Sequence, residues 1–158
     1  MKIYVLGSNS FVKDMVARKD ELRQLGYDGW IHEDYENHVK GKVKAFSDDK
    51  RENAQYKISH DYIRSHYKHI LESDAILIVN NEKHGVKNYI GGNVLMEMGM
   101  AYVNDKKIFF LNDMPTEAPY LDEIHAMQPI CLHGNLNNIS KNTRHGSKIP
   151  RIIRAKHS

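Results

Sequence analysis

The strongest constraint in this sequence is a run of five consecutive apolar residues, Ala75–Val79 (AILIV). A strand without polar alternation needs cover on both of its faces, which is typical of the centre of a parallel sheet. Two other short apolar runs, residues 2–6 (KIYVL) and 107–111 (KIFFL), indicate further buried strands. The chain is therefore predicted to be an α/β protein, a three-layer sandwich in which helices cover both faces of a mostly parallel sheet.

Helical spacing and stop signals separate these runs. One helix is predicted from near Phe11, with Ser10 as its cap, to a stop at Gly26. Brief strands at residues 30–31 and 129–132 complete a five-stranded sheet. The other predicted helices cover residues 58–71, 94–103 and 119–127.

Length and composition exclude several classes of protein. A chain of 158 residues is long enough for one domain, and its 41% hydrophobic and 27% charged residues exclude wholesale disorder. No apolar run approaches the ~20 residues that cross a bilayer, and the N-terminus has too few apolar residues for a signal peptide. The single cysteine, Cys131, excludes an internal disulfide framework and a Cys-rich zinc site. We therefore expect a cytoplasmic protein without a membrane partner.

The net charge of +3 is concentrated at the C-terminus. Residues 141–158 carry six Lys and Arg side chains and no acid, whereas the rest of the chain has 17 basic and 20 acidic residues. We interpret residues 1–140 as the domain and residues 141–158 as a basic, flexible tail. Such a tail is also compatible with nucleic acid or an acidic partner, but it lacks the aromatic residues that stack on bases, so we favour the flexible tail over nucleic-acid binding.

Polar and glycine-rich segments follow the predicted strands. In an open parallel sheet, ligands bind outside the carboxyl ends of the strands, where the chain order reverses. In the loop after the first strand, a glycine lets a ligand approach the backbone closely, and the side chains offer hydrogen-bond donors. The N-terminus of the following helix is suited to an anion. Candidate binding residues are therefore Gly7, Ser8, Asn9 and Ser10 in that loop, Asn80 after the central strand, and Gly91, Gly92 and Asn93 at the next helix start. The first loop alone is equally compatible with Gly7 as a turn residue and Ser10 as a cap.

One acidic residue, Glu97, lies in a strongly apolar helix (GGNVLMEMGMA, residues 91–101). A helix that is apolar on nearly all sides is buried, and a buried carboxylate is costly unless it is paired or hydrogen-bonded. Such groups are enriched at functional sites. The alternative is that Glu97 lies on a single exposed stripe, because Asn93 and Asn104 share its approximate face.

The same segment resembles a known family. Glu-Met-Gly-Met-Ala at residues 97–101, followed by Asp105, Lys106 and an apolar strand, is similar to the E-x-G-x-A helix of the nucleoside 2-deoxyribosyltransferase superfamily, which includes the deoxynucleoside monophosphate N-glycosidases. The opening strand ending in Gly7, the Ser73-Asp74 pair before the central strand, and the segment at 134–136 (GNL) agree with it. The resemblance covers roughly residues 2–136 and implies a flavodoxin-like or Rossmann-like fold.

The resemblance also implies an activity. In this superfamily the motif glutamate, here Glu97, attacks the anomeric carbon of the sugar, and the resulting glycosyl-enzyme is resolved by a second base or by water. A carboxylate suits this role, as in retaining glycosidases. The substrate would be a small-molecule nucleoside or nucleotide, no cofactor is implied, and a homodimer or higher homo-oligomer would complete the site.

The sequence departs from the family at a second catalytic position. Where the family has an aspartate before the central strand, an ungapped count back from Asp74 reaches His66, and Asp61 lies about five residues earlier. A histidine can protonate a leaving base near neutral pH, so His66, or else Asp61, is the candidate for assisting the base. The alternative for His66 is a buried, hydrogen-bonded side chain. Transferase and hydrolase activities both stay open.

Residues 32–53 are polar and weakly periodic, so we expect a long loop or lid with a short helical piece there, shielding the intermediate from water. Trp30 or Tyr35 is available to stack on the base. The histidines lack the H-E-x-x-H spacing, so no metal site is expected. Two other functions remain open, namely a non-catalytic nucleotide-binding or sensing module and an NAD-type glycohydrolase.

Overall fold

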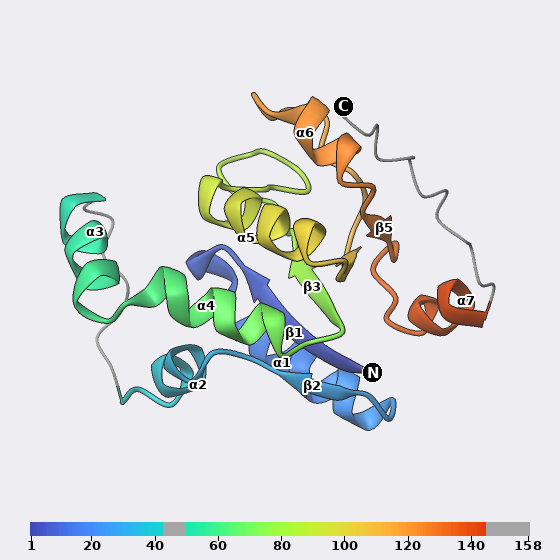
Figure 1. Cartoon of the computed structure of the whole chain (residues 1–158), viewed down its shortest axis with the longest axis horizontal. Helices are drawn as coiled ribbons and strands as arrows, with labels where there is room; N and C mark the ends of the chain where they lie inside the picture. The colour runs from blue at the N-terminus through green and yellow to red at the C-terminus, as the bar shows by residue number, and fades with distance from the viewer. Residues whose placement is uncertain (43–49, 145–158) are drawn as a thin grey trace, which may run out of the picture.

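The computed structural model describes residues 1–42 and 50–144 (Figure 1). The five strands in these described ranges form one sheet in the order β2-β1-β3-β4-β5, and every neighbouring pair is parallel. This arrangement confirms the predicted α/β sandwich, and the strand order is that of flavodoxin-like folds. The strands are β1 (Lys2–Gly7), β2 (Asp28–Trp30), β3 (Ala75–Val79), β4 (Lys107–Phe110) and β5 (Ile130–Cys131).

Helices cover both faces of the sheet. One buried cluster joins a sheet face to α1, and a second joins the opposite face to α4, α5 and α6. Figure 1 shows α4 and α5 crossing in front of β1 and β3. The helices are η1 (Asn9–Phe11), α1 (Val12–Gln24), α2 (Glu33–Val39), α3 (Lys50–Ser59), α4 (Tyr62–Leu71), α5 (Gly92–Val103), α6 (Leu121–Ala126) and α7 (Asn138–Arg144).

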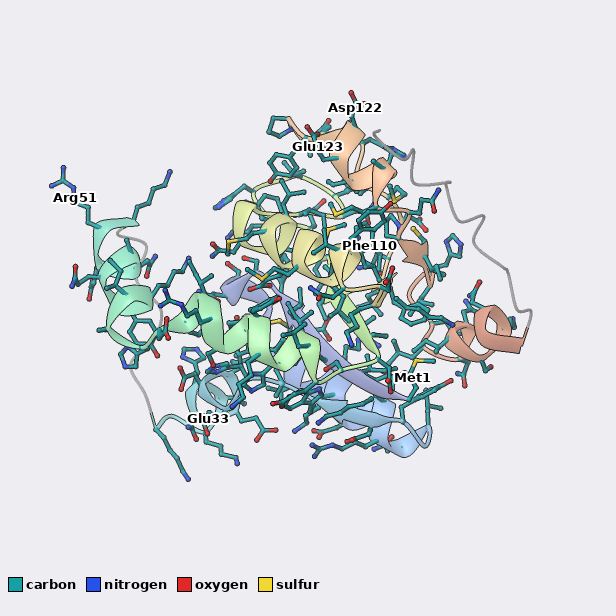
Figure 2. The ribbon with its side chains drawn as sticks, viewed as in Figure 1. Met1, Glu33, Arg51, Phe110, Asp122 and Glu123 are labelled. Atoms are coloured by element: carbon teal, nitrogen blue, oxygen red, sulfur yellow. The ribbon has the colours of Figure 1, made fainter. Side chains whose placement is uncertain are left out.

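The centre of the sheet is as apolar as the sequence predicts. All five residues of β3 are fully buried, because helices cover it on both sides. Phe110 of β4 is buried in the same way, whereas Asp122 and Glu123 project from α6 (Figure 2). Gly7 pairs with Val79, and a Cβ atom at Gly7 would lie 2.8 Å from the Val79 carbonyl oxygen. A glycine is therefore needed where β1 ends beside β3.

The helix predicted for residues 58–71 is two helices, so that prediction was wrong in its extent. Asp61 has a φ of 47°, which is left-handed, and it separates α3 from α4. Ile58 lies on α3 with 72% of its surface exposed, instead of on the buried face of one long helix. A single residue in this conformation redirects the chain, because a right-handed helix cannot continue through it.

The loop predicted for residues 32–53 was also wrong in part. Its described residues include all of α2 and the start of α3, while residues 43–49 lie outside the described part of the chain. The boundary predicted at residue 140 falls inside α7, and residues 145–158 of the predicted tail lie outside the described residues. Within residues 1–42 and 50–144, none of the helices has the length and apolar character of a membrane span.

Candidate functional site

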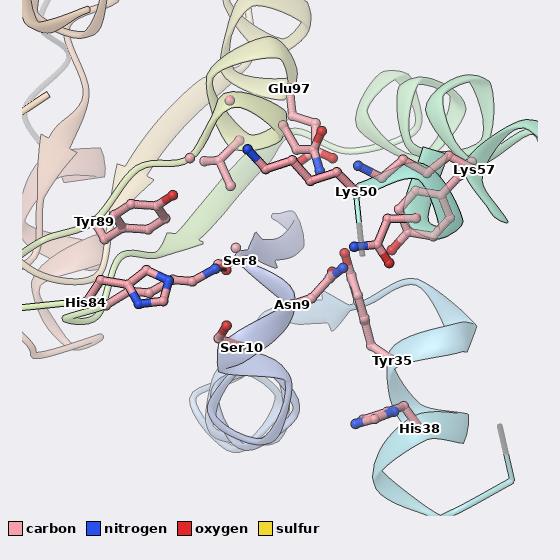
Figure 3. A pocket seen from close by; sticks show the side chains of 18 residues that line it. Ser8, Asn9, Ser10, Tyr35, His38, Lys50, Lys57, His84, Tyr89 and Glu97 are labelled. Carbon is pink, nitrogen blue, oxygen red and sulfur yellow. Dashed lines mark hydrogen bonds between the residues drawn. The ribbon is translucent and has the colours of Figure 1, made fainter. Parts of the chain in front are cut away.

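A cavity of about 680 Å³ lies where β1 and the loop leading to α5 leave the sheet (Figure 3). This is the point at which the strand order reverses, with β1 and β3 neighbours and their connections running to opposite faces. Most of the predicted site residues line this cavity, namely Gly7, Ser8, Asn9, Ser10, Gly91, Gly92, Asn93 and Glu97. The other lining residues are Tyr35, His38, Lys50, Asn53, Lys57, Tyr62, Lys83, His84, Tyr89 and Val94.

Glu97 lies on the buried face of α5. It follows Val94 by three residues and precedes Ala101 by four, and all three are buried. Its side chain is only 7% exposed, and that exposed edge is in the cavity. The alternative of an exposed stripe is therefore wrong.

Burial controls the ionisation of Glu97. Removal of water raises the pKa of the Glu97 carboxyl to about 8, and the positive charge of Lys57 opposes that rise. The carboxyl is therefore protonated in most molecules at pH 7. A carboxyl with a pKa this far from its ordinary value, at the edge of a cavity, has the character of a functional group.

His66 of α4 lies behind Glu97 and does not line the cavity. Its Nδ1 atom is 2.6 Å from the Tyr4 hydroxyl, with which it shares a hydrogen bond, and 3.6 Å from Oε1 of Glu97, which is too long for one. The imidazole is 1% exposed, and burial lowers the pKa of His66 to about 2. The ring is therefore neutral, and it fits the buried, hydrogen-bonded alternative better than the role of proton donor to a base.

Aromatic rings surround this pair and keep water away. Tyr62 meets His66 edge-on with the ring centroids 4.2 Å apart, and His32 stacks on it at 4.9 Å. Burial raises the pKa of Tyr35 and of Tyr62 far above the ordinary tyrosine value, so both phenols keep their protons. Sequence reasoning missed Tyr62 and Tyr4; the available signal for Tyr4 was a phenol inside the apolar run at residues 2–6.

Two further candidates from the sequence do not line the cavity. Asp61 has a side chain 63% exposed and pairs with Arg64 at 3.1 Å, away from the cavity. Asn80 is fully buried; its Nδ2 donates to the Asp113 carbonyl and its Oδ1 accepts from the Asn112 amide. Asn80 therefore joins the ends of β3 and β4 and does not reach the cavity.

Of the two residues proposed to stack on a base, only Tyr35 lines the cavity. Trp30 stacks on His69 with ring centroids 4.6 Å apart and donates a hydrogen bond from Nε1 to the Ser73 hydroxyl. Tyr89, which the sequence did not single out, is a further aromatic residue of the cavity wall, and the Lys83 ammonium lies 5.3 Å from its ring centre. The tyrosines of this wall are thus better placed than Trp30 to contact a ligand ring.

The cavity is electropositive. Three lysines line it, and Glu97 is the one acidic residue among its described lining residues. Lys83 donates a hydrogen bond to the Ser8 hydroxyl at 2.9 Å, which places its charge over the loop that follows β1. Because the Glu97 carboxyl is largely neutral at pH 7, it does not cancel the lysine charges, and the described lining of the cavity is suited to an anionic ligand. The lysines are Lys50, Lys57 and Lys83.

Within the described part of the chain, His, Cys, Asp and Glu side chains form no group of three or more that is placed to hold a metal ion. Cys131 is half-buried in β5, and burial raises the pKa of its thiol, so it lacks the character of an activated nucleophile. Comparison of the chain with protein-family models, with curated proteins and with solved structures finds no match.

Proposed function

We propose that this protein cleaves or transfers the N-glycosidic bond of a (deoxy)nucleoside or its 5′-monophosphate, with Glu97 as the nucleophile. The observation that carries the proposal is the Glu97 carboxyl, buried against apolar and aromatic side chains with only its edge in a cationic cavity. The resemblance of residues 97–101 to the superfamily motif supports the same role.

The chemistry needs an ionised carboxyl. The Glu97 carboxylate attacks the anomeric carbon as the bond to the base breaks, and a glycosyl ester forms. Water or a second base then displaces the carboxylate. Because the pKa of Glu97 is raised to about 8, the ionised fraction increases with pH, and base release is expected to rise from pH 6 towards pH 8.

The polar end of the cavity is suited to a phosphate. Ser8 and Lys83 supply a hydroxyl and an ammonium group, and the N-terminus of α5 at Gly91 and Gly92 presents backbone N–H groups to the same cavity. These groups support a 5′-monophosphate over an uncharged nucleoside as the substrate. The resemblance also predicts a homodimer or higher homo-oligomer, which light scattering coupled to size exclusion can measure.

The test is a substrate panel of nucleosides, their 5′-monophosphates and NAD, with released bases separated by chromatography. Native protein is expected to release a base, and Glu97→Ala is expected to release none while it still binds the substrate. Glu123→Gln, an exposed change on α6, is the matched control and is expected to keep full activity. A native protein that binds nucleotides but releases no base would overturn the proposal and favour a sensing module, and cleavage of NAD alone would favour an NAD-type glycohydrolase.

A further inference from the structure

In the proposed reaction, the departing base lacks its predicted proton donor, because His66 lies outside the cavity and is neutral. We propose that Lys57 takes this role, meeting the departing base with its ammonium group and giving it a proton. This inference rests on the proposed N-glycosidic function and assigns a catalytic residue that sequence reasoning did not identify.

Lys57 reaches the cavity from α3. It lies seven residues after Lys50, two helical turns away, so both lysines share one face of α3. Both line the cavity, and Figure 3 shows their side chains extending from α3 towards Glu97. The helix thus presents cationic groups to the side of the cavity where the nucleophile lies.

The charge on Lys57 has no ion-pair partner among the described residues, since no acidic side chain there lies within ion-pair distance of it. Lys19 shows the contrast, because it is buried and contacts both Asp20 and Glu36. Lys57 is also close enough to Glu97 for its charge to lower the pKa of that carboxyl. An unpaired cation within electrostatic range of the nucleophile is suited to negative charge that develops during the reaction.

In this proposal, the other cationic side of the cavity binds the 5′-phosphate of the substrate. Lys83 is fixed to Ser8 by a hydrogen bond of 2.9 Å, and Figure 3 shows Ser8 and His84 on the side of Glu97 away from Lys57. In a nucleotide the base and the 5′-phosphate leave the sugar ring on opposite sides of the ring oxygen. A phosphate held at Ser8 therefore directs the base towards α3 and Lys57.

The step balances in protons and electrons. As the Glu97 oxygen forms its bond to the anomeric carbon, the glycosidic electron pair goes to the base nitrogen, and Lys57 donates a proton to the base. Lys57 becomes a neutral amine. When water attacks the glycosyl ester, its proton goes to Lys57, the C–O bond to Glu97 breaks with its electron pair on the carboxylate, and both groups return to their starting states.

The test compares substrates that differ in their need for this proton. One pair is 2′-deoxyguanosine 5′-monophosphate and its N7-methyl derivative, whose base already carries a positive charge. The other is 2′-deoxyuridine 5′-monophosphate and its 5-fluoro derivative, whose base is a better leaving group. For the pair that native protein cleaves, Lys57→Gln is expected to lower kcat about 100-fold on the ordinary substrate and less than about tenfold on the activated one.

Lys50→Gln is the matched control, since it removes the same charge two turns away on α3, and it is expected to reduce both members of a pair by a similar factor. Lys57→Arg keeps the charge and shows whether a cation alone restores part of kcat. An equal loss on both members for Lys57→Gln would overturn the role of Lys57 while leaving the glycosidase intact. Absence of base release by native protein from every substrate would instead overturn the proposed function itself.

Discussion

The buried carboxyl makes a prediction about folding that does not depend on any substrate. Glu97→Gln keeps the size and shape of the side chain and removes its titration. In native protein the pKa of Glu97 is raised from 4.5 to about 8 by burial, and in the unfolded chain it returns towards 4.5. Between these two values the unfolded chain has lost the proton while the folded protein still holds it, so the free energy of unfolding falls as the pH rises.

The size of the effect follows from the two pKa values. Each pH unit inside the window changes the free energy of unfolding by up to about 1.4 kcal/mol. From pH 5 to pH 8 this one group therefore lowers the stability of native protein by about 3 kcal/mol, whereas Glu97→Gln does not lose it. Other titrating groups, such as His66, contribute equally to both proteins and cancel in the difference.

The measurement is urea-induced unfolding of both proteins at pH 5, 6, 7 and 8, followed by circular dichroism. The stability of Glu97→Gln relative to native protein is expected to increase steadily across the series by about 3 kcal/mol. Glu123→Gln on α6, where the side chain is exposed, is the control and is expected to show a difference that does not change with pH. A constant difference for Glu97→Gln as well would show that Glu97 titrates normally and would refute the buried, neutral carboxyl.

Three further changes test the groups around Glu97. Lys83→Gln removes the charge at the phosphate end and is expected to weaken binding of a 5′-monophosphate about tenfold or more, with little effect on the nucleoside, as measured by calorimetry. Tyr4→Phe leaves Nδ1 of His66 without its hydrogen bond and is expected to reduce the free energy of unfolding by about 1–3 kcal/mol in urea titrations; no change would show that the buried bond is dispensable. Gly7→Ala forces a Cβ atom to within 2.8 Å of the Val79 carbonyl oxygen and is expected to lower the melting temperature, whereas an unchanged value would mean that the strand ends can separate.

The strands could be predicted because each of the main ones corresponds to a local run of apolar residues. Five consecutive apolar residues in β3 indicate a strand buried on both faces, and the order of strands and helices along the chain then leaves few topologies. The same logic predicted the buried position of Glu97, since its neighbours on α5 are nearly all apolar. The loop after β1 was predicted to line a binding site from its position at the end of a strand, its glycine and its polar side chains, and it lines the cavity.

The wrong predictions concern features that depend on the backbone conformation of one residue or on contacts between residues far apart in the sequence. The local sequence pattern does not distinguish a left-handed Asp61 from a helical one, so the sequence predicts one helix where the structure has two. The hydrogen bond of His66 joins residues 62 positions apart, and this contact holds the predicted proton donor in a buried position beside Glu97. Asn80 was placed in the site by its position after β3, but its amide is used by the backbone of the next loop.

That same amide of Asn80 makes the two ends of the cavity unequal in stiffness. Its carboxamide bonds both Asn112 and Asp113, so the segments leaving β3 and β4 are tied together at the base of the loop that carries Lys83. By contrast, α3 has no buried side chain, and a helix that buries little apolar surface opens locally at a lower cost in free energy. Under the proposed function, the end of the cavity fixed by Asn80 is expected to bind the phosphate at small entropic cost, and the α3 end is expected to adjust to the base. Under that function, such a cavity is expected to accept several bases on one shared sugar phosphate, and substitutions along α3 are expected to change the base preference.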